Sequence, residues 1–116
     1  MEVATEKQHK DHLRAAYTLH VEAKGETIGM ARIIGDGGFI NYLVDVIVTP
    51  SYQGKGVGRA IMERVITFVI SNIPKGGRTM IDLSSAKDKE GFYEKFGFVS
   101  RPNEKEGAGM QLRLKG

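Results

Sequence analysis

Alternating apolar and polar residues near the start of the chain predict a β-hairpin. In residues 15–23, apolar side chains at Tyr17, Leu19 and Val21 alternate with polar ones, which is the two-residue period of a half-buried strand. A Lys-Gly-Glu turn follows, and residues 27–34 are expected to return as the second strand. The two strands should therefore pair antiparallel.

A continuous apolar segment and a helical stripe form the middle of the chain. Residues 42–48 are apolar and mostly β-branched apart from Asp45, which predicts a central strand covered on both faces. After a glycine-rich turn, residues 59–73 repeat apolar side chains at helical spacing, and Asn72 and Pro74 are expected to end this helix. Its apolar stripe consists of Ile61, Val65, Phe68 and Val69.

The last third of the chain interleaves short strands with one short helix. Residues 79–83, 98–99 and 110–114 are expected to form strands, and residues 89–96 a helix that Gly97 stops. Strands that alternate with helices favour a mixed sheet with helices on its faces. The pattern therefore predicts an α/β fold.

Length and composition predict one domain. The 116 residues, 41% of them hydrophobic, suffice for a single packed core and leave no room for a second one. Residues 1–12 are polar and are expected to form a frayed helix or a disordered segment. The chain is therefore divided into a polar lead, residues 1–14, and a single domain, residues 15–116. Neither a signal peptide nor a membrane span is expected.

Charge and cysteine content argue against several functional classes. The 17 basic and 14 acidic residues give a net charge of +3 and are scattered along the chain. Such a mild positive field suits an anionic cofactor and is too weak to indicate a nucleic acid. Because the chain has no cysteine, a disulfide framework, a thiolate zinc site and a cysteine nucleophile are excluded, and cytoplasmic residence is expected.

The glycine-rich turn carries the strongest chemical signal. Residues 46–59 run from the apolar strand through the turn into the helix, with glycine at positions Gly54, Gly56 and Gly58. Without side chains there, successive backbone N–H groups can point into one concavity at the positive end of the helix dipole. A diphosphate would fit such an anion site, and two basic residues add positive charge at its rim.

Other phosphate-binding motifs do not match this turn. A P-loop needs Ser or Thr directly after Gly-Lys, whereas Gly56 follows Lys55 and the helix opens with Arg59. The dinucleotide fingerprint needs the spacing G-x-G-x-x-G in a longer βαβ unit, whereas the spacing here is G-x-G-x-G. A turn that merely connects strand to helix is the remaining alternative.

These segments resemble the GNAT superfamily of N-acetyltransferases. Residues 53–58, Gln-Gly-Lys-Gly-Val-Gly, are similar to its Gln/Arg-x-x-Gly-x-Gly/Ala signature, and residues 45–50 are similar to the strand before it. Residues 90–98 resemble the Phe-Tyr-x-x-x-Gly-Phe segment near the C-terminus of that family. The two motifs stand in the family's order, and the resemblance, which extends to small bacterial members, covers about residues 15–114.

The resemblance implies a fold, a reaction and a cosubstrate. The implied fold is a mixed α/β domain with a mostly antiparallel, twisted sheet flanked by helices. The implied reaction transfers an acetyl group from acetyl-CoA to a primary amine by direct attack in a ternary complex, without a metal. The acceptor is expected to be a small molecule rather than a protein. The residues implied in cofactor binding are Val46, Ile47, Val48, Gln53, Gly54, Lys55, Gly56, Val57, Gly58 and Arg59.

Two side chains are candidates for proton transfer. By the resemblance, Tyr93 occupies the position whose phenol can protonate the departing coenzyme A thiolate, and the alternative is that it only packs in a short helix. Asp45 is the candidate general base, since strand alternation places it on the face of Leu43 and Ile47, where a charge is costly unless paired or useful. A structural hydrogen bond from Asp45, or a water chain that deprotonates the amine, is the alternative.

The chain departs from the family's pattern at its N-terminus. Members carry a strand and one or two helices before the first hairpin, and these form much of the acceptor wall, whereas about 14 residues precede Ala15 here. The acceptor site is therefore expected to be open, completed by a partner subunit, or missing. The apolar strip left uncovered predicts a homodimer. A non-catalytic acyl-CoA-binding or regulatory domain is the alternative function.

Overall fold

The computed structural model describes residues 2–7, 15–36 and 38–116, which divide into two compact units. The first unit is Met1–Leu83 and the second is Ser84–Gly116. The first contains a sheet and one long helix, and the second contains a short helix followed by an irregular segment.

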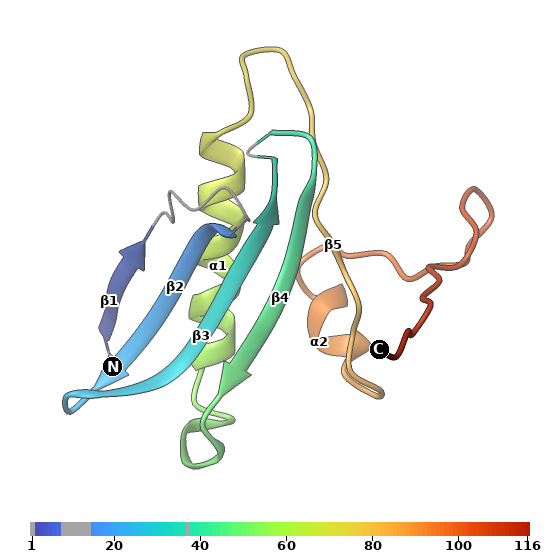
Figure 1. Ribbon diagram of the computed structural model, residues 1–116. Helices are drawn as coiled ribbons and strands as arrows, with labels where there is room; N and C mark the ends of the chain where they lie inside the picture. The colour runs from blue at the N-terminus through green and yellow to red at the C-terminus, as the bar shows by residue number, and fades with distance from the viewer. Residues whose placement is uncertain (1, 8–14, 37) are drawn as a thin grey trace. The chain divides into compact units, whose positions relative to one another are not determined.

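The first unit is built on a five-stranded sheet with the strand order β1-β2-β3-β4-β5 (Figure 1). Neighbours from β1 to β4 pair antiparallel, whereas β4 and β5 pair parallel. The strands are β1 Glu2–Lys7, β2 Ala15–Ala23, β3 Glu26–Gly35, β4 Asn41–Val48 and β5 Asp82–Leu83. The expected mixed, mostly antiparallel sheet is therefore confirmed.

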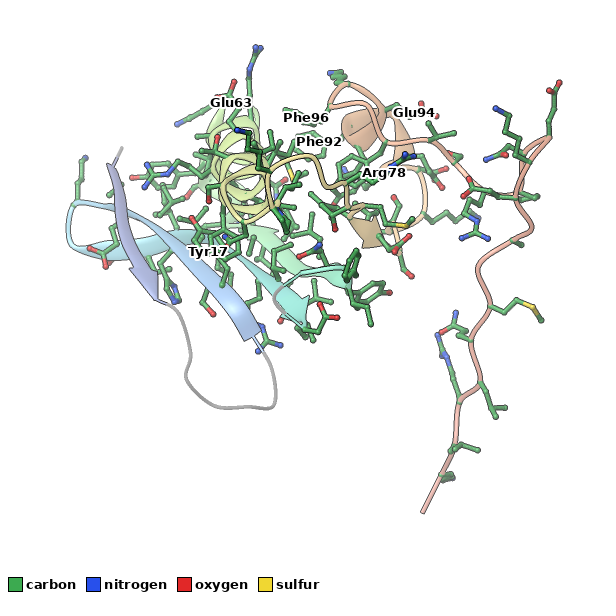
Figure 2. All side chains as sticks on the ribbon, turned by 90° about the horizontal axis from the view of Figure 1, so that it is seen from above. Tyr17, Glu63, Arg78, Phe92, Glu94 and Phe96 are labelled. Atoms are coloured by element: carbon green, nitrogen blue, oxygen red, sulfur yellow. The ribbon has the colours of Figure 1, made fainter. Side chains whose placement is uncertain are left out.

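The helix α1, Val57–Ser71, covers one face of this sheet (Figure 2). Its buried side chains are Val57, Ile61, Met62, Val65 and Val69. The ring of Phe68 stacks on that of Tyr17 from β2, with ring centroids 4.1 Å apart. The helix ends two residues before the expected position 73, because the side-chain amide of Asn72 donates to the Phe68 carbonyl at 2.9 Å. The predicted apolar stripe thus forms the core beneath α1.

The strand β1 corrects the expectation for the polar N-terminal segment. Instead of a frayed helix or a disordered segment, residues 2–7 pair antiparallel with β2. The physical reason is that the outer edge of β2 offers unpaired backbone groups, which a polar segment can satisfy as well as an apolar one. Residues 8–14 of the predicted lead lie outside the described residues.

The strand β4 is exposed on one face, so the expectation that both faces are covered is wrong. Leu43 is buried beneath α1, whereas Tyr42 is exposed and Ile47 is 53% exposed. The strand has α1 on one side, and a β-bulge in its pairing with β3 changes which side chains face the core. An apolar, β-branched run alone does not reveal how many layers cover it.

The second unit contains the helix α2, Glu90–Glu94, within the predicted range 89–96. Gly97 follows it with φ +95°, a left-handed conformation that ends a helix. The strands expected at 98–99 and 110–114 do not form in the described structure, and only Asp82–Leu83 of the range 79–83 is a strand. Alternation gives a segment the potential to pair, but a strand also requires a partner backbone.

A buried asparagine fixes the loop between β3 and β4. The Asn41 side-chain amide donates to the Gly38 carbonyl at 3.1 Å and to Thr79 Oγ1 at 2.9 Å, and the Thr79 hydroxyl donates to the same carbonyl at 2.8 Å. In the loop itself, the N–H groups of Ile40 and Gly38 donate to Asp36 and hold the pKa of its carboxyl below the usual value. The segment before β5 is therefore tied to the β4 end of the loop.

We expect Gly35→Ala to destabilise the protein by about 3 kcal/mol, because the added methyl group would overlap the Ile40 carbonyl oxygen. Gly38→Ala, in the loop that follows Gly35, is the matched control, since the nearest atom to its methyl group would be Asp36 Oδ1 at 3.8 Å, an ordinary contact. Urea denaturation of both variants measures the difference. Equal midpoints for the two variants would contradict this packing.

Candidate functional site

The turn between β4 and α1 is anchored to the end of β4. The Thr49 N–H donates to the Ile28 carbonyl at 2.8 Å and continues the ladder between β3 and β4. A 3-10 turn, η1 Pro50–Tyr52, follows. The side-chain amide of Gln53 then reaches back and donates to the Val48 carbonyl at 3.0 Å. Gln53 therefore holds the turn against the strand.

Two glycines give the turn its shape. Gly54 has φ +76° and Gly56 has φ +85°, both in the left-handed region that other residues adopt only at a cost. A Cβ atom at either position would meet nothing within 4 Å. Glycine is thus required here by backbone conformation, and the space beside the turn is open.

The start of α1 presents free hydrogen-bond donors. In the described part of the chain, none of the backbone N–H groups from Gly54 to Arg59 donates to a protein acceptor. The first three residues of a helix lack an intrahelical acceptor, and the helix dipole is positive at this end. No acidic residue lies in the first turn of α1. The predicted turn therefore has the properties of an anion site.

Gly29 in β3 allows the start of α1 to approach the sheet. A Cβ atom there would lie 3.1 Å from Ile61 Cδ1, 3.2 Å from Val57 Cγ1 and 3.3 Å from the Ile47 carbonyl oxygen. A methyl group at this position would require these neighbours to give by a few tenths of an ångström. Sequence reasoning missed this residue, although an isolated glycine inside a strand pattern is a signal of close backbone approach.

Basic side chains flank the turn. Lys55 Nζ lies 5.4 Å from the centroid of the Tyr52 ring, a cation–π distance. Arg59 Nε lies 3.5 Å from Glu63 Oε2 in an exposed pair, which contributes little to stability. Tyr52 is a second residue that the sequence analysis did not single out, and it orients Lys55 beside the turn.

The structure corrects the environment expected for Asp45. Its side chain is 44% exposed, and its Oδ2 atom lies 2.9 Å from Arg32 Nε. The expected shared face fails for Leu43, which is buried, because of the β-bulge in which Arg32 pairs with Val44 and Met30 with Ile47, whereas Ile47 is exposed as Asp45 is. Asp45 is therefore a paired carboxylate on the exposed side of the sheet.

Tyr93 lies in the second unit, on α2, among aromatic rings. Its ring meets Phe92 and Phe98 edge-on at centroid distances of 5.1 and 6.0 Å, and Phe92 meets Phe96 at 5.3 Å. Figure 2 labels Phe92 and Phe96. Partial burial raises the pKa of the Tyr93 phenol. Within the described residues, its hydroxyl makes no hydrogen bond. The Tyr93 ring is packed against other aromatic rings, as the alternative to a catalytic role predicts, while its hydroxyl is available to donate a hydrogen bond to a ligand.

The described residues form neither a metal-ligand cluster nor a membrane-spanning helix. Among the described residues, no three His, Cys, Asp or Glu side chains group in a way that could hold a metal ion. Of the three histidines, His20 lies in β2, and His9 and His12 lie outside the described ranges. Within those ranges, none of the helices has the length and apolar character to cross a bilayer.

Known proteins with similar sequences are acetyltransferases. The model of the acetyltransferase (GNAT) domain family matches residues 2–113. GCN5-related N-acetyltransferase 1, chloroplastic, of Arabidopsis thaliana is 37% identical over 92 residues, which cover 79% of this chain and 45% of that protein. Serotonin N-acetyltransferase 2, chloroplastic, of Oryza sativa subsp. japonica is 38% identical over 79 residues, which cover 68% of this chain and 38% of that protein. The chain thus spans less than half the length of these two relatives.

Solved structures agree with this comparison. A probable acetyltransferase from meticillin-resistant Staphylococcus aureus has a TM-score of 0.74 and 32% sequence identity. The match covers 90% of this chain and 76% of that one. The likeness therefore extends over nearly the whole chain.

Proposed function

This chain belongs to the GNAT family of N-acetyltransferases, and from that premise we propose that it transfers an acetyl group from acetyl-CoA to a primary amine. The amine attacks the thioester directly in a ternary complex, so the protein contributes positioning and proton transfer. Residues 53–59 hold the coenzyme A diphosphate. The backbone of Val46–Val48 holds the acetyl-bearing arm.

The observation that carries this proposal is the row of free N–H groups between Gly54 and Arg59. A diphosphate offers several acceptor oxygens and negative charge, and both are favoured at the N-terminus of a helix. Because Gln53 ties the turn to the end of β4, the anion site and the backbone of Val46–Val48 are held close together. The residues present therefore suit a ligand with a diphosphate at one end and a thioester at the other.

The chain supplies three elements of the chemistry. A backbone N–H in Val46–Val48 polarises the thioester carbonyl and stabilises the negative charge that develops on its oxygen. Tyr93 donates its phenolic proton to the departing thiolate, and partial burial, which raises the pKa of the phenol, favours its neutral, proton-bearing form. For deprotonation of the amine, Asp45 and a water chain are the two candidates, and the ion pair between Asp45 and Arg32 favours the water chain.

The proposed acceptor is a small-molecule amine rather than a protein, a nucleic acid or a membrane component. Support comes from the rice relative, whose name specifies serotonin, a small primary amine. Cytoplasmic residence remains part of the proposal, on the cysteine-free composition.

Calorimetric titration with acetyl-CoA, coenzyme A and pantetheine tests the cofactor site. We expect the two coenzyme A compounds to bind and pantetheine, which lacks the diphosphate, to bind far more weakly. Acetyl transfer is then measured over aryl-alkyl amines, aliphatic amines and a lysine peptide. Binding without transfer to any amine would favour the non-catalytic acyl-CoA-binding domain. If pantetheine bound as tightly as coenzyme A, the proposal that the turn holds the diphosphate would be contradicted.

We also expect the protein to be a homodimer. The first unit exposes large apolar side chains at Phe39, Ile40 and Ile47, and exposed apolar surface of this kind favours association. Light scattering at high micromolar concentration should give about twice the chain mass of 12.8 kDa. A mass equal to one chain would contradict this expectation.

A further inference from the structure

The irregularity in β4 is centred on one residue with an unusual backbone. Arg32 pairs with Val44 and Met30 pairs with Ile47, so Asp45 and Val46 together stand opposite Ala31. This two-against-one arrangement is a β-bulge, which bends the strand and interrupts the ladder. Asp45 has φ +55°, a left-handed conformation that is uncommon outside glycine and that aspartate adopts more readily than most residues.

An ion pair spans the interruption. Arg32 Nε on β3 donates to Asp45 Oδ2 on β4 at 2.9 Å, a short, charge-assisted hydrogen bond between neighbouring strands. Both side chains are partly exposed, at 38% and 44%, so the pair adds little to overall stability. Its position is what distinguishes it, because it joins the strands at the point where the regular ladder is broken.

The bulge leads into the segment Val46–Val48, whose backbone is proposed above to hold the acetyl-bearing arm. The direction of these three residues depends on the conformation of Asp45, since a bulge redirects the strand that follows it. The far end of the segment is fixed by the Gln53 amide on the Val48 carbonyl at 3.0 Å. The near end is fixed by the pair between Arg32 and Asp45.

We propose that Arg32 and Asp45 are positioning residues, which hold the bulge so that the Val46–Val48 backbone meets the thioester. This role rests on the proposed acetyl transfer. Asp45 then acts through the backbone and its carboxylate takes no proton from the amine. An oxyanion donor must lie within a few tenths of an ångström of its acceptor position, so a loosened bulge lowers transfer more than it lowers stability.

The kinetic test uses Arg32→Gln, Asp45→Asn, the double variant and Arg32→Lys, with Arg78→Gln as the control. Arg78 is an exposed arginine of the same unit that makes no ion pair with a described residue. Each single variant should lower kcat about tenfold, and the double variant should be no worse than either single one. Arg32→Lys should recover most of the loss, and the control should match the wild type.

The pH profile separates positioning from base catalysis. A positioning role leaves the acidic limb of kcat in place in every variant. A base role removes that limb in Asp45→Asn alone and leaves Arg32→Gln fully active. Loss of the acidic limb in Asp45→Asn alone, or full activity of Arg32→Gln, would overturn the proposal.

Backbone NMR tests the bulge without any ligand. In Arg32→Gln, the amide resonances of Asp45 to Val48 should move and the HN–Hα coupling of residue 45 should change, whereas Arg78→Gln should leave them in place. Unmoved resonances in Arg32→Gln refute the positioning role even if the protein transfers acetyl groups. If the resonances move as expected but the wild type binds no acetyl-CoA, the proposed function fails separately from the structural role of the pair.

Discussion

Replacing Tyr93 with Phe is expected to lower kcat about 10²-fold while leaving the acetyl-CoA affinity nearly unchanged. The substitution removes the hydroxyl and keeps the ring, so the edge-on contacts with Phe92 and Phe98 persist. A leaving-group acid acts in the transition state and contributes little to ground-state binding. Steady-state kinetics with an accepted amine, together with calorimetric titration of acetyl-CoA, measures both quantities.

Phe96→Leu is the matched control for this substitution. Phe96 lies in the turn after α2, and its replacement disturbs the aromatic contact with Phe92 but leaves the Tyr93 phenol intact. We expect it to lower the thermal midpoint while kcat stays within about twofold of the wild type. If Tyr93→Phe behaves like this control, and chemistry limits turnover, Tyr93 belongs to the packing of α2 and the acid is another group.

The raised pKa of Tyr93 also predicts a pH dependence. Burial favours the neutral phenol, so the group keeps its proton to a higher pH than an exposed tyrosine, whose pKa is about 10. The midpoint of the loss of kcat caused by deprotonation of Tyr93 should therefore lie above about pH 10, the value for an exposed tyrosine, and Tyr93→Phe should abolish this loss. Circular dichroism over the same range controls for alkaline unfolding. A Tyr93-dependent decline of kcat below pH 9 would mean that the pKa of Tyr93 is lowered rather than raised, and it would contradict this prediction.

Replacing Gly56 with Val is expected to weaken acetyl-CoA binding about 10²-fold. Val strains the left-handed backbone at φ +85° and fills the open space beside the N–H groups. The loss of about two charge-assisted hydrogen bonds to the diphosphate, each worth about 1.5 kcal/mol, corresponds to that factor. Calorimetric titration of the folded variant gives the affinity directly.

Two further variants separate strain from obstruction. Gly56→Asn adds a side chain with less backbone strain, because asparagine tolerates the left-handed region, and it should weaken binding about tenfold. Gly76→Val imposes similar strain at φ +78° away from the turn, where a Cβ atom also meets nothing within 4 Å. It should lower stability and leave the affinity unchanged. An unaltered affinity in Gly56→Val would remove the basis for placing the diphosphate at this turn.

Local features of the site were predictable from the sequence. The turn before α1 is defined by Gly54 and Gly56, whose backbone freedom is a property of single residues, and the helix after it has a period that the apolar stripe reveals directly. The strand β2 was expected at 15–23 and occurs there, since strict alternation has only one regular solution. The aromatic pair of Phe92 and Phe96 likewise follows from helical spacing.

Features that depend on a partner strand were not predictable in this way. The polar segment of β1 pairs because β2 offers a free edge. The alternating segment 110–114 is irregular because it pairs with no neighbouring strand in the described structure. The sequence predicted Gln53 as a cofactor-binding residue but did not indicate that its side-chain amide donates to the Val48 carbonyl. Pairing is a property of two segments, and a one-dimensional pattern describes each segment alone.

The sequence alone predicted the periods of β2 and α1 and the glycine-rich turn between β4 and α1, because each follows from residues within one element or one turn. The tertiary structure was needed to establish which face of β4 is covered, and that Asp45 pairs with Arg32 across a bulge. It also decided that Gly29 allows α1 to approach the sheet. These features join residues 13 or more positions apart, such as Arg32 and Asp45 or Gly29 and Ile61. Their geometry depends on strand register, and a single bulge can move the side chains that follow it to the other face of the sheet.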